Sequence, residues 1–190
     1  MIIAGLNLIG SPVNRNVPLA ISRSGKPLAT YDKAFLIPGF ESRYQRGTSI
    51  ALFSVASTEA GLLICKDMDF PSWVRLYERA GARILFLPAW DFGDDAWLHS
   101  RMATLRGVEL GCAVVRSASE GLLSVSDYRG NVVEARSSSL PMSSLVARVL
   151  PGPGKTLYSA AGDWYAWLNV IVLTFILGRN VARRRRRSIS

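Results

Sequence analysis

Short apolar runs separated by turn residues dominate the first part of the chain. Residues 1–8 are apolar apart from one asparagine and predict a buried strand. The runs 17–22 and 28–31 flank the turn-forming residues 24–27, so they predict a hairpin. The sequence therefore predicts β-structure from its first residues.

Two further strands are expected around the first cysteine. Pro38 and Gly39 end the apolar stretch 34–37, so Glu41 is expected to lie on a loop. Beyond it, the runs 50–54 and 61–65 predict a strand pair. The second run is almost wholly apolar, as in strands that are covered on both faces.

From Pro71 the hydrophobic pattern changes to a helical period. Apolar residues recur at roughly 3.6-residue spacing between Pro71 and Gly81, so a helix is expected there. The continuous apolar run 84–88 is typical of a parallel strand. The remaining expected elements are a helix from Asp94 or Asp95 to Gly111 and strands at 113–117, 122–126 and 132–135. Strands that alternate with helices indicate an α/β domain.

The composition of the chain changes after residue 150. Residues 144–150 are expected to form the last strand of a domain 1–150, and a Pro/Gly-rich linker follows over 151–159. Residues 160–178 are mostly apolar, and at about 1.5 Å per residue they approach the thickness of a hydrocarbon core. Residues 179–190 form a basic tail.

Three interpretations of the segment 160–178 and its tail are open: a buried core helix, a nucleic-acid-binding patch, or a membrane span. Aromatic residues stand near the start of the segment, and six arginines follow it, Arg179 and Arg183 to Arg187. This asymmetry favours a transmembrane helix whose basic tail stays in the cytoplasm. The domain 1–150 is then expected on the other side of the membrane.

The composition excludes several classes of protein. The net charge of +9 is concentrated in the tail, because its six arginines leave only +3 for the rest. So weakly basic a surface does not indicate nucleic acid as a partner. Two cysteines are too few for a disulfide framework, and the single histidine, His99, lacks neighbours at metal-binding spacing. No metal and no cofactor are expected, and His99 is interpreted as structural.

Cys65 stands where the apolar run 61–65 ends and before the helix that Pro71 opens. A thiol at the carboxyl end of a sheet lies near backbone N–H groups and cations that can lower its pKa and make it a nucleophile. A buried core cysteine is the alternative, since free cysteines are among the most buried residues. Position alone leaves both interpretations open.

Three sequence motifs, which follow one another along the chain, help to decide between a nucleophilic and a buried core cysteine. They are Tyr31-Asp-Lys-Ala-Phe-Leu-Ile-Pro-Gly-Phe-Glu41, the run from Leu62 through Cys65 to Pro71, and the run from Trp97 through His99 and Arg106 to Gly111. Together they make the chain resemble the carbon-nitrogen hydrolase, or nitrilase, superfamily. The motifs look closest to the carboxyl-terminal part of its membrane-bound branch, the bacterial apolipoprotein N-acyltransferases. The resemblance implies a partial nitrilase-like α-β-β-α sandwich, followed here by one C-terminal transmembrane helix.

Members of this superfamily use a Glu, Lys and Cys triad, and the resemblance implies that Lys33 is the lysine and Cys65 the nucleophile. An ammonium beside a thiolate stabilises it, and also the charge that develops on the attacked carbonyl oxygen. Glu41 matches a further carboxylate of the acyltransferase site. Lys66 and Asp67 stand where that branch usually has an aromatic residue and a glutamate, and they are expected to bind substrate or support the site.

The triad glutamate, the general base of the family, has no counterpart before Lys33, because the first acidic residue of the chain is Asp32. The domain 1–150 is therefore expected to be N-terminally incomplete and impaired on its own. A separate N-terminal polypeptide is an expected partner.

The function implied by the resemblance is acyl transfer from a phospholipid, through a thioester on Cys65, to the N-terminus of a lipoprotein. A membrane-anchored hydrolase of amidase type is an alternative, which Asp67 favours because soluble relatives also carry the shorter carboxylate. A catalytically inactive pseudoenzyme is a third. The implied location is the bacterial inner membrane, with the domain periplasmic or otherwise extracytoplasmic and the tail 179–190 cytoplasmic.

Overall fold

The structure is a computed structural model that describes residues 1–10, 12–138 and 143–187. The last three residues of the expected basic tail, 188–190, lie outside the described part. The chain divides into two compact units, Met1–Thr156 and Leu157–Ser190. Each unit is described by itself.

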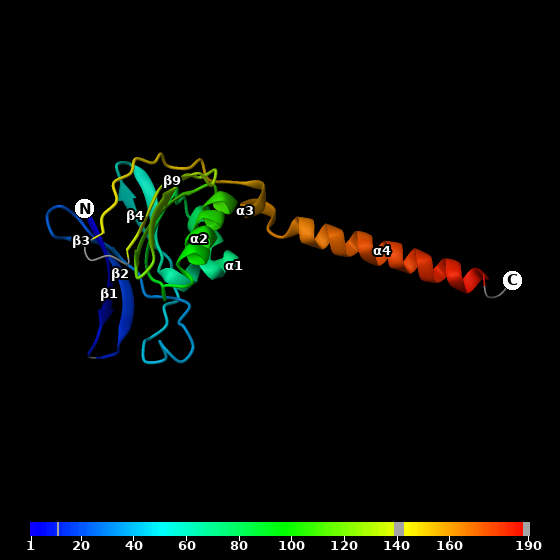
Figure 1. Cartoon of the computed structure of the whole chain (residues 1–190), viewed down its shortest axis with the longest axis horizontal. Helices are drawn as coiled ribbons and strands as arrows, with labels where there is room; N and C mark the ends of the chain where they lie inside the picture. Colours follow the sequence, from blue (N-terminus) through cyan, green and yellow to red (C-terminus); the bar gives the residue numbers. More distant parts are fainter. Residues whose placement is uncertain (11, 139–142, 188–190) are drawn as a thin grey trace. The chain divides into compact units, whose positions relative to one another are not determined.

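Two sheets form the first unit (Figure 1). The smaller, antiparallel sheet contains β1 (Ile2–Leu8), β2 (Arg15–Ile21) and β3 (Pro27–Thr30). The six strands of the larger sheet follow the order of the chain: β4 (Ala51–Val55), β5 (Thr58–Leu62), β6 (Ile84–Trp90), β7 (Ala113–Ser119), β8 (Leu122–Ser126) and β9 (Val132–Ser137). Its centre, from β5 to β7, is parallel, and both flanks are antiparallel. The hairpin and the alternating α/β elements are thus confirmed.

Helices follow the parallel strands. The 3₁₀ helix η1 (Cys65–Asp69) and α1 (Pro71–Arg79) come after β5, and α2 (Ala96–Leu110) connects β6 to β7. Pro71 suits the first turn of α1, where its missing N–H has no partner to lose. Gly111 ends α2 in the left-handed region, at φ +66. Asp95 occupies the N-cap position of α2, although its described side chain makes no cap hydrogen bond.

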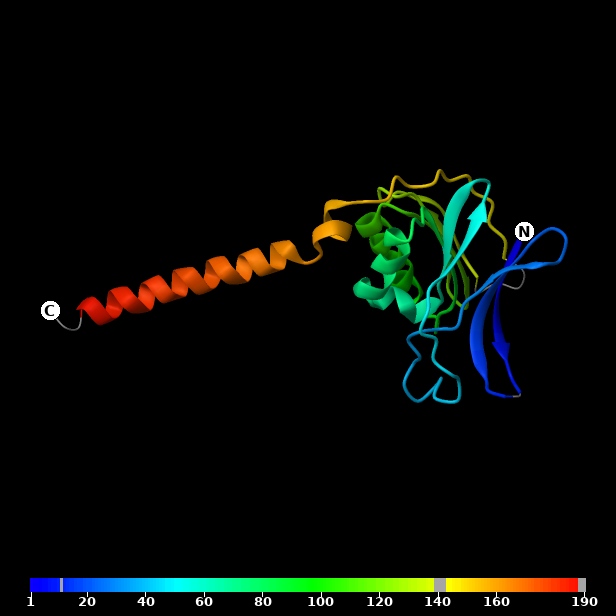
Figure 2. The ribbon, with the colours of Figure 1, turned by 180° about the vertical axis from the view of Figure 1, so that it is seen from behind.

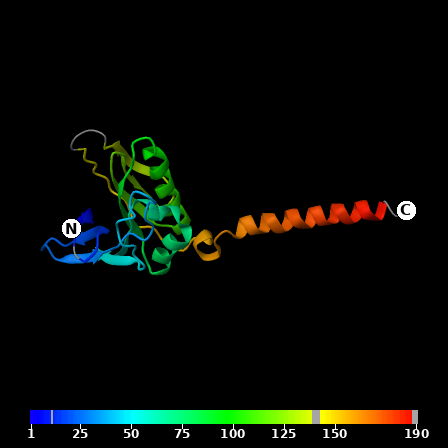
Figure 3. The same cartoon turned by 90° about the horizontal axis from the view of Figure 1, so that it is seen from below.

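The elements form three layers, seen edge-on in Figure 3. Along β6, Leu85 and Leu87 face a core that they share with α1 and α2. Ile84 and Phe86 point the other way, into the core beneath the small sheet. This strand is continuously apolar because both of its faces are covered. The described residues thus give the α-β-β layers of the expected sandwich.

The predicted burial of the first strand is wrong. Ile2 is 66% exposed, and the side chains of Leu6 and Leu8 also reach solvent. Within the described chain, β1 is the edge of the small sheet and pairs only with β2. An apolar run does not reveal whether its strand lies at an edge or at the centre of a sheet.

Residues 151–156 are held on the first unit by backbone hydrogen bonds. The N–H of Gly152 donates to the carbonyl of Arg83 at 3.0 Å, and that of Gly154 to the carbonyl of Gly111 at 2.9 Å. The N–H of Lys155 donates to buried Glu78 at 3.0 Å. We call these three hydrogen bonds the Gly152–Gly154 clamp. The strand predicted at 144–150 is wrong, because these residues join no strand ladder.

The second unit contains α3 (Leu157–Ala161) and α4 (Trp164–Arg187). Gly162, at φ +61, separates them, so the apolar helix begins later than the expected residue 160. Figure 3 shows α4 as one continuous helix. Among the described residues, no helix is both long and apolar enough to cross a bilayer, so the predicted transmembrane helix is not confirmed.

Candidate active site

The loop after β3 carries a buried ion pair. Lys33 is 1% exposed, and its Nζ lies 2.8 and 2.6 Å from the two carboxylate oxygens of Glu41. Asn16 of β2 and the backbone N–H of Ile37 each donate to Glu41 at 2.7 Å. Gly39, at φ +82, lets the loop turn back so that Glu41 meets Lys33. Four hydrogen bonds therefore occupy the Glu41 carboxylate.

Cys65 is the first residue of η1, shortly after β5. Its backbone φ of +45 lies in a region that residues other than glycine seldom adopt, and such strain is often held at functional sites. The Sγ atom lies 3.7 Å from the carbonyl oxygen of Trp90. Burial raises the pKa of the thiol, while the Lys33 ammonium acts in the opposite direction. The half-buried thiol is thus held in one place but is not ionised by burial.

Asp67 ties the Cys65 turn to the Lys33 loop. Its fully buried carboxylate accepts the backbone N–H groups of Phe35 at 2.9 Å and Ile64 at 3.1 Å. Burial raises the pKa of Asp67 to about 6, against the lowering effect of these hydrogen bonds. Asp67 therefore fixes the positions of two active-site segments rather than facing an open space.

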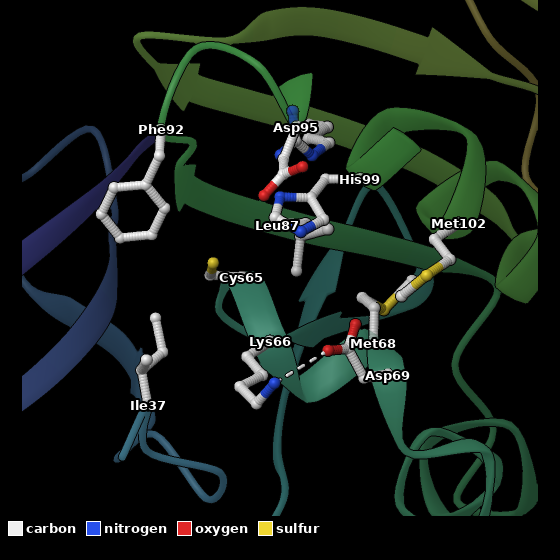
Figure 4. A pocket seen from close by; sticks show the side chains of 11 residues that line it. Ile37, Cys65, Lys66, Met68, Asp69, Leu87, Phe92, Asp95, His99 and Met102 are labelled. Carbon is white, nitrogen blue, oxygen red and sulfur yellow. Dashed lines mark hydrogen bonds and ion pairs between the residues drawn. The ribbon is translucent and has the colours of Figure 1, made fainter. Parts of the chain in front are cut away.

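Two cavities meet at Cys65. The Lys33 cavity has a volume of about 460 Å³ and includes Asn16, Lys33, Glu41 and Cys65 in its lining. The loop between β3 and β4 passes from the small sheet to the large sheet (Figure 2), and Lys33, Glu41 and Tyr44 of this loop line the cavity. The His99 cavity, drawn in Figure 4, has a volume of about 190 Å³. Its lining combines apolar side chains with Cys65, Lys66, Asp69, Asp95, His99 and Arg116.

A buried charged cluster supports the His99 cavity. Asp91 is fully buried just beyond β6, and its Oδ1 accepts Nη2 of Arg116 at 2.5 Å. Nδ1 of His99 lies 3.1 Å from the same oxygen. Among the described residues, Oδ2 of Asp91 has no hydrogen-bond partner. The sequence interpretation missed Asp91 and Arg116, although an aspartate directly after an apolar parallel strand is a usable signal.

The structure brings the three predicted catalytic residues together, because Lys33, Glu41 and Cys65 line one cavity. Lys66 lies in the other lining and pairs with Asp69 at 3.3 Å. The chemical roles predicted for these residues, and for Asp67, stay predictions. Within the described residues, no cluster of histidine, cysteine and carboxylate side chains has the arrangement of a metal site.

The chain is similar in sequence to known proteins. Residues 1–138 match the family model described as carbon-nitrogen hydrolase. An apolipoprotein N-acyltransferase of Geobacter metallireducens is 30% identical over 132 residues, which cover 65% of this chain and 24% of that protein. The apolipoprotein N-acyltransferase of Bradyrhizobium diazoefficiens is 30% identical over 210 residues, which cover 92% of this chain and 37% of that protein. The chain therefore spans well under half the length of these relatives.

Solved structures show the same fold. An amidase from Nesterenkonia sp. superposes with a TM-score of 0.65 at 21% identity, covering 72% of this chain and 57% of the amidase. A cysteine-to-alanine mutant of the Nesterenkonia AN1 amidase, described as coming from the nitrilase superfamily, gives a TM-score of 0.62 at 21% identity and covers 69% of this chain and 54% of that one. The first unit thus has an α/β, nitrilase-like fold.

Proposed function

Because the chain belongs to the carbon-nitrogen hydrolase family, we propose that it transfers acyl groups through a thioester on Cys65. The main support for this proposal is the position of the Cys65 thiol. It stands on a strained turn and shares a cavity with the Lys33–Glu41 pair. A thiol at such a position can attack an ester carbonyl and hold the acyl group covalently.

The proposed donor is a phospholipid, and the proposed acceptor is the N-terminal amino group of a lipoprotein. The names of the curated relatives support this choice over other acyl transfers. Acyl transfer from donor to enzyme precedes transfer from enzyme to acceptor, so the kinetics are of the ping-pong type.

Each predicted site residue has a proposed role. The Lys33 ammonium stabilises the Cys65 thiolate and then the negative charge on the attacked carbonyl oxygen. Glu41 holds that ammonium in place through two hydrogen bonds. Asp67 keeps the Cys65 turn against the loop that carries Lys33. Lys66 lies in the lining of the adjoining cavity, where it can contact a polar group of the substrate.

Mass spectrometry of the intact chain tests this proposal. After incubation with vesicles of a dipalmitoyl phospholipid, we expect one palmitoyl adduct, which maps to Cys65 and forms slowly because the chain is expected to be impaired on its own. Cys65→Ala abolishes the adduct, whereas Cys112→Ser keeps it, because Cys112 is buried in the core. An N-terminal diacylglyceryl-cysteine peptide discharges the adduct and becomes N-acylated. Absence of any adduct on Cys65 rejects acyl transfer by this chain.

Amidase-type hydrolysis is the second candidate, in which water resolves the acyl-enzyme. The shorter carboxylate of Asp67 favours it over acyl transfer to an amine. Release of ammonia from small amides, without a lipid adduct, identifies this activity. If neither activity is found, the inactive-pseudoenzyme alternative holds for the chain alone.

A separate polypeptide that carries a glutamate base is a further part of the proposal. Reconstitution tests it: adding an upstream segment of a related acyltransferase is expected to restore or raise formation of the Cys65 adduct. The matched control is the same segment with its glutamate changed to glutamine.

We also propose that the second unit attaches the first to a bacterial inner membrane. Exposed apolar side chains along α4, flanked by Trp164 and Trp167 at one end and by Arg179 at the other, support attachment. The proposed orientation, with the domain extracytoplasmic and the basic tail cytoplasmic, stays a prediction. Membrane fractionation tests attachment: the full chain is expected in the membrane fraction and a 1–156 truncation outside it.

A further inference from the structure

From the hydrogen bonds of η1 we infer that Arg106 of α2 is a positioning residue, which holds the turn that carries the Cys65 thiol. The inference rests on the proposed function for the identity of Cys65 as the nucleophile. Because a guanidinium neither accepts nor gives up a proton, the general base stays with the separate polypeptide proposed above. Arg106 acts through the backbone of the turn.

The end of η1 has a backbone carbonyl that a continuation of the helix cannot satisfy. In a 3₁₀ helix, the carbonyl of each residue accepts the N–H of the residue three positions later. For Met68 that residue is Pro71, which has no N–H. Met68 is 2% exposed, and a buried carbonyl without a donor is costly. The sequence Met68-Asp-Phe-Pro71 therefore calls for a donor from outside η1.

Arg106 supplies that donor. Its Nε–H donates to the carbonyl oxygen of Met68 at 3.0 Å. Nη1 of the same guanidinium pairs with the carboxylate of Glu109, which lies one turn further along α2. The two paired side chains are 13% and 17% exposed, so the guanidinium is held in place rather than moving freely in solvent. A planar guanidinium can serve both partners at once, whereas the ammonium of a lysine is a compact point charge.

The Cys65 turn is thus held at both ends. Near its start, the Asp67 carboxylate accepts the backbone N–H of Ile64 at 3.1 Å, which fixes η1 close to the end of β5. At its far end, Arg106 fixes it to α2. Cys65 has a φ of +45, and such a strained backbone persists only when its surroundings enforce it. Two attachments on a helix of five residues limit the positions that its backbone can take.

The other contacts of η1 do not replace this hydrogen bond. Lys66 and Asp69 pair with each other, as the dashed line in Figure 4 marks, but both belong to η1 and cannot anchor it to another element. The Met68 side chain packs in the apolar core with residues of α1 and α2, and apolar contact is not directional. Among the described hydrogen bonds, that of Arg106 is the one that joins η1 to α2.

Arg106 acts on the rate of acylation rather than on substrate binding. It is absent from the described linings of both cavities that meet at Cys65, so it does not contact a substrate there. A shift of η1 would instead change the distance between the Cys65 thiol and the Lys33 ammonium, which lies on the loop after β3. A displacement of about 1 Å at a reacting group can lower a rate by about 100-fold. Loss of Arg106 is therefore expected to slow acylation of Cys65 and to leave donor binding unchanged.

Selective isotope labelling tests the contact in the full chain. The sequence contains one Met-Asp step, Met68-Asp69, so ¹³C-carbonyl methionine with ¹⁵N-aspartate isolates the Met68 carbonyl in an NMR spectrum. In Arg106→Met this carbonyl signal is expected to move upfield, because the carbonyl loses a hydrogen bond. Arg101→Met, an exposed change on the same helix, is the matched control and is expected to leave the signal in place. An unchanged Met68 signal in Arg106→Met overturns the inference.

The position of Cys65 is measured in the same way. The sequence contains one Ile-Cys step, Ile64-Cys65, so ¹³C-carbonyl isoleucine with ¹⁵N-cysteine isolates the Cys65 amide. Arg106→Met is expected to shift or broaden this amide signal, and Arg101→Met is not. Lower stability alone leaves the signals of the folded protein in place, so a shift reports the turn itself. If Arg106→Met does not fold, Arg106→Met/Glu109→Met leaves neither charge unpaired and carries the same measurements. An unmoved Cys65 amide overturns the inference.

Formation of the Cys65 adduct gives the functional readout. In Arg106→Met the limiting rate of adduct formation is expected to fall by about tenfold or more, while the donor concentration that gives half of that rate stays the same. An unchanged limiting rate, or a change in the half-saturating concentration alone, rejects the inference. Absence of the adduct in the unmodified chain would reject the proposed function, whereas the two NMR signals would still decide whether Arg106 positions the turn.

Discussion

The two sides of Cys65 are both lined by charged side chains, yet they satisfy those charges in different ways. On the Lys33 side, the Glu41 carboxylate receives four hydrogen bonds and its cationic partner is 1% exposed. On the other side, Asp91 shares one oxygen between Arg116 and His99 and leaves the second without a described partner. A fully satisfied network fixes charge in place, whereas the Asp91 cluster keeps one buried oxygen atom without a described partner.

The two sides of Cys65 also differ in which segments of the chain contribute their residues, and this explains the difference. The loop after β3 carries both Lys33 and Glu41, so a single turn brings the pair together. The Asp91 cluster is assembled from β6, α2 and β7, whose ends meet only in the folded sheet. We therefore expect the first side to contribute more to stability than the second.

Breaking the Lys33–Glu41 pair has the largest expected effect. Glu41→Leu leaves the ammonium of Lys33 buried without its counter-charge, which is expected to lower the free energy of unfolding by about 3–5 kcal/mol. Urea unfolding monitored by tryptophan fluorescence measures the change. The double variant Lys33→Met/Glu41→Leu is expected to recover much of the loss, because no buried charge remains.

His99→Gln is the matched change on the other side of Cys65. It leaves the Asp91–Arg116 pair intact and is expected to alter the free energy of unfolding by less than about 1 kcal/mol. A loss in His99→Gln that equals that of Glu41→Leu would contradict the division between the two sides.

The next largest effect is the pH dependence contributed by Asp67. Because burial raises the pKa of Asp67 to about 6, the folded state binds its proton more tightly than the unfolded state. This stabilisation is present below the unfolded pKa, near 4, and is lost as the pH rises through about 6. A pKa difference of about two between the folded and unfolded states corresponds to roughly 3 kcal/mol.

Asp67→Asn isolates that contribution. Loss of its hydrogen bonds makes the variant less stable at pH 4, and the gap in free energy of unfolding between the two proteins is expected to narrow between pH 4 and pH 7. Urea unfolding at each pH measures it. A gap that is constant, or that widens with pH, would show that Asp67 is not protonated preferentially in the folded state.

Gly121→Ala tests the space around Asp91. The added Cβ would overlap Oδ2 of Asp91, so the cluster must shift, with an expected loss of about 1–3 kcal/mol. The His99 resonances are expected to move as well, because the ring is held by the same carboxylate. Gly25→Ala is a control for glycine removal, since nothing lies within 4 Å of the Cβ that it would add, although the φ of +79 at Gly25 adds local strain. Unchanged His99 resonances in Gly121→Ala would mean that Asp91 does not orient the ring.

The smallest effect is expected for the ion pair between Arg15 and Asp32, which adjoins Lys33 in sequence. Its side chains are 38% and 34% exposed. Arg15→Gln is therefore expected to lower the free energy of unfolding by only about 0.2–1 kcal/mol, and less in high salt. Denaturation at two salt concentrations measures this. A loss comparable to that of Glu41→Leu would mean that burial is not what separates the two pairs.

The sequence carries enough information to predict most of the α/β core. Helical spacing from Pro71 to Gly81 predicts α1, and a continuous apolar run predicts the buried strand β6. These signals depend only on local periodicity and burial. The edge position of β1 and the lack of a strand at 144–150 depend on which partners the chain finds, and local patterns do not carry that information.

Some residues of the candidate site are likewise predicted from the sequence, and others are found only in the structure. Lys33, Glu41 and Cys65 stand in ordered motifs, so the resemblance identifies them before any geometry is known. Asp91 and Arg116 are distant in sequence and lie in or beside apolar strands, where a polar residue looks like an interruption of the pattern. Only the parallel register of β6 and β7, which pairs Leu87 with Arg116, brings them together.

The Gly152–Gly154 clamp has a mechanical consequence. A pulling force applied to the chain beyond Thr156 would reach the first unit at the hydrogen bonds to Gly111, Arg83 and Glu78. These attachments lie at the turn between α2 and β7, near the end of α1 and directly before β6, so tension would be shared by two helices and a central strand of the large sheet. None of the three hydrogen bonds involves the Cys65 turn, so detaching the clamp would be expected to leave that turn in place.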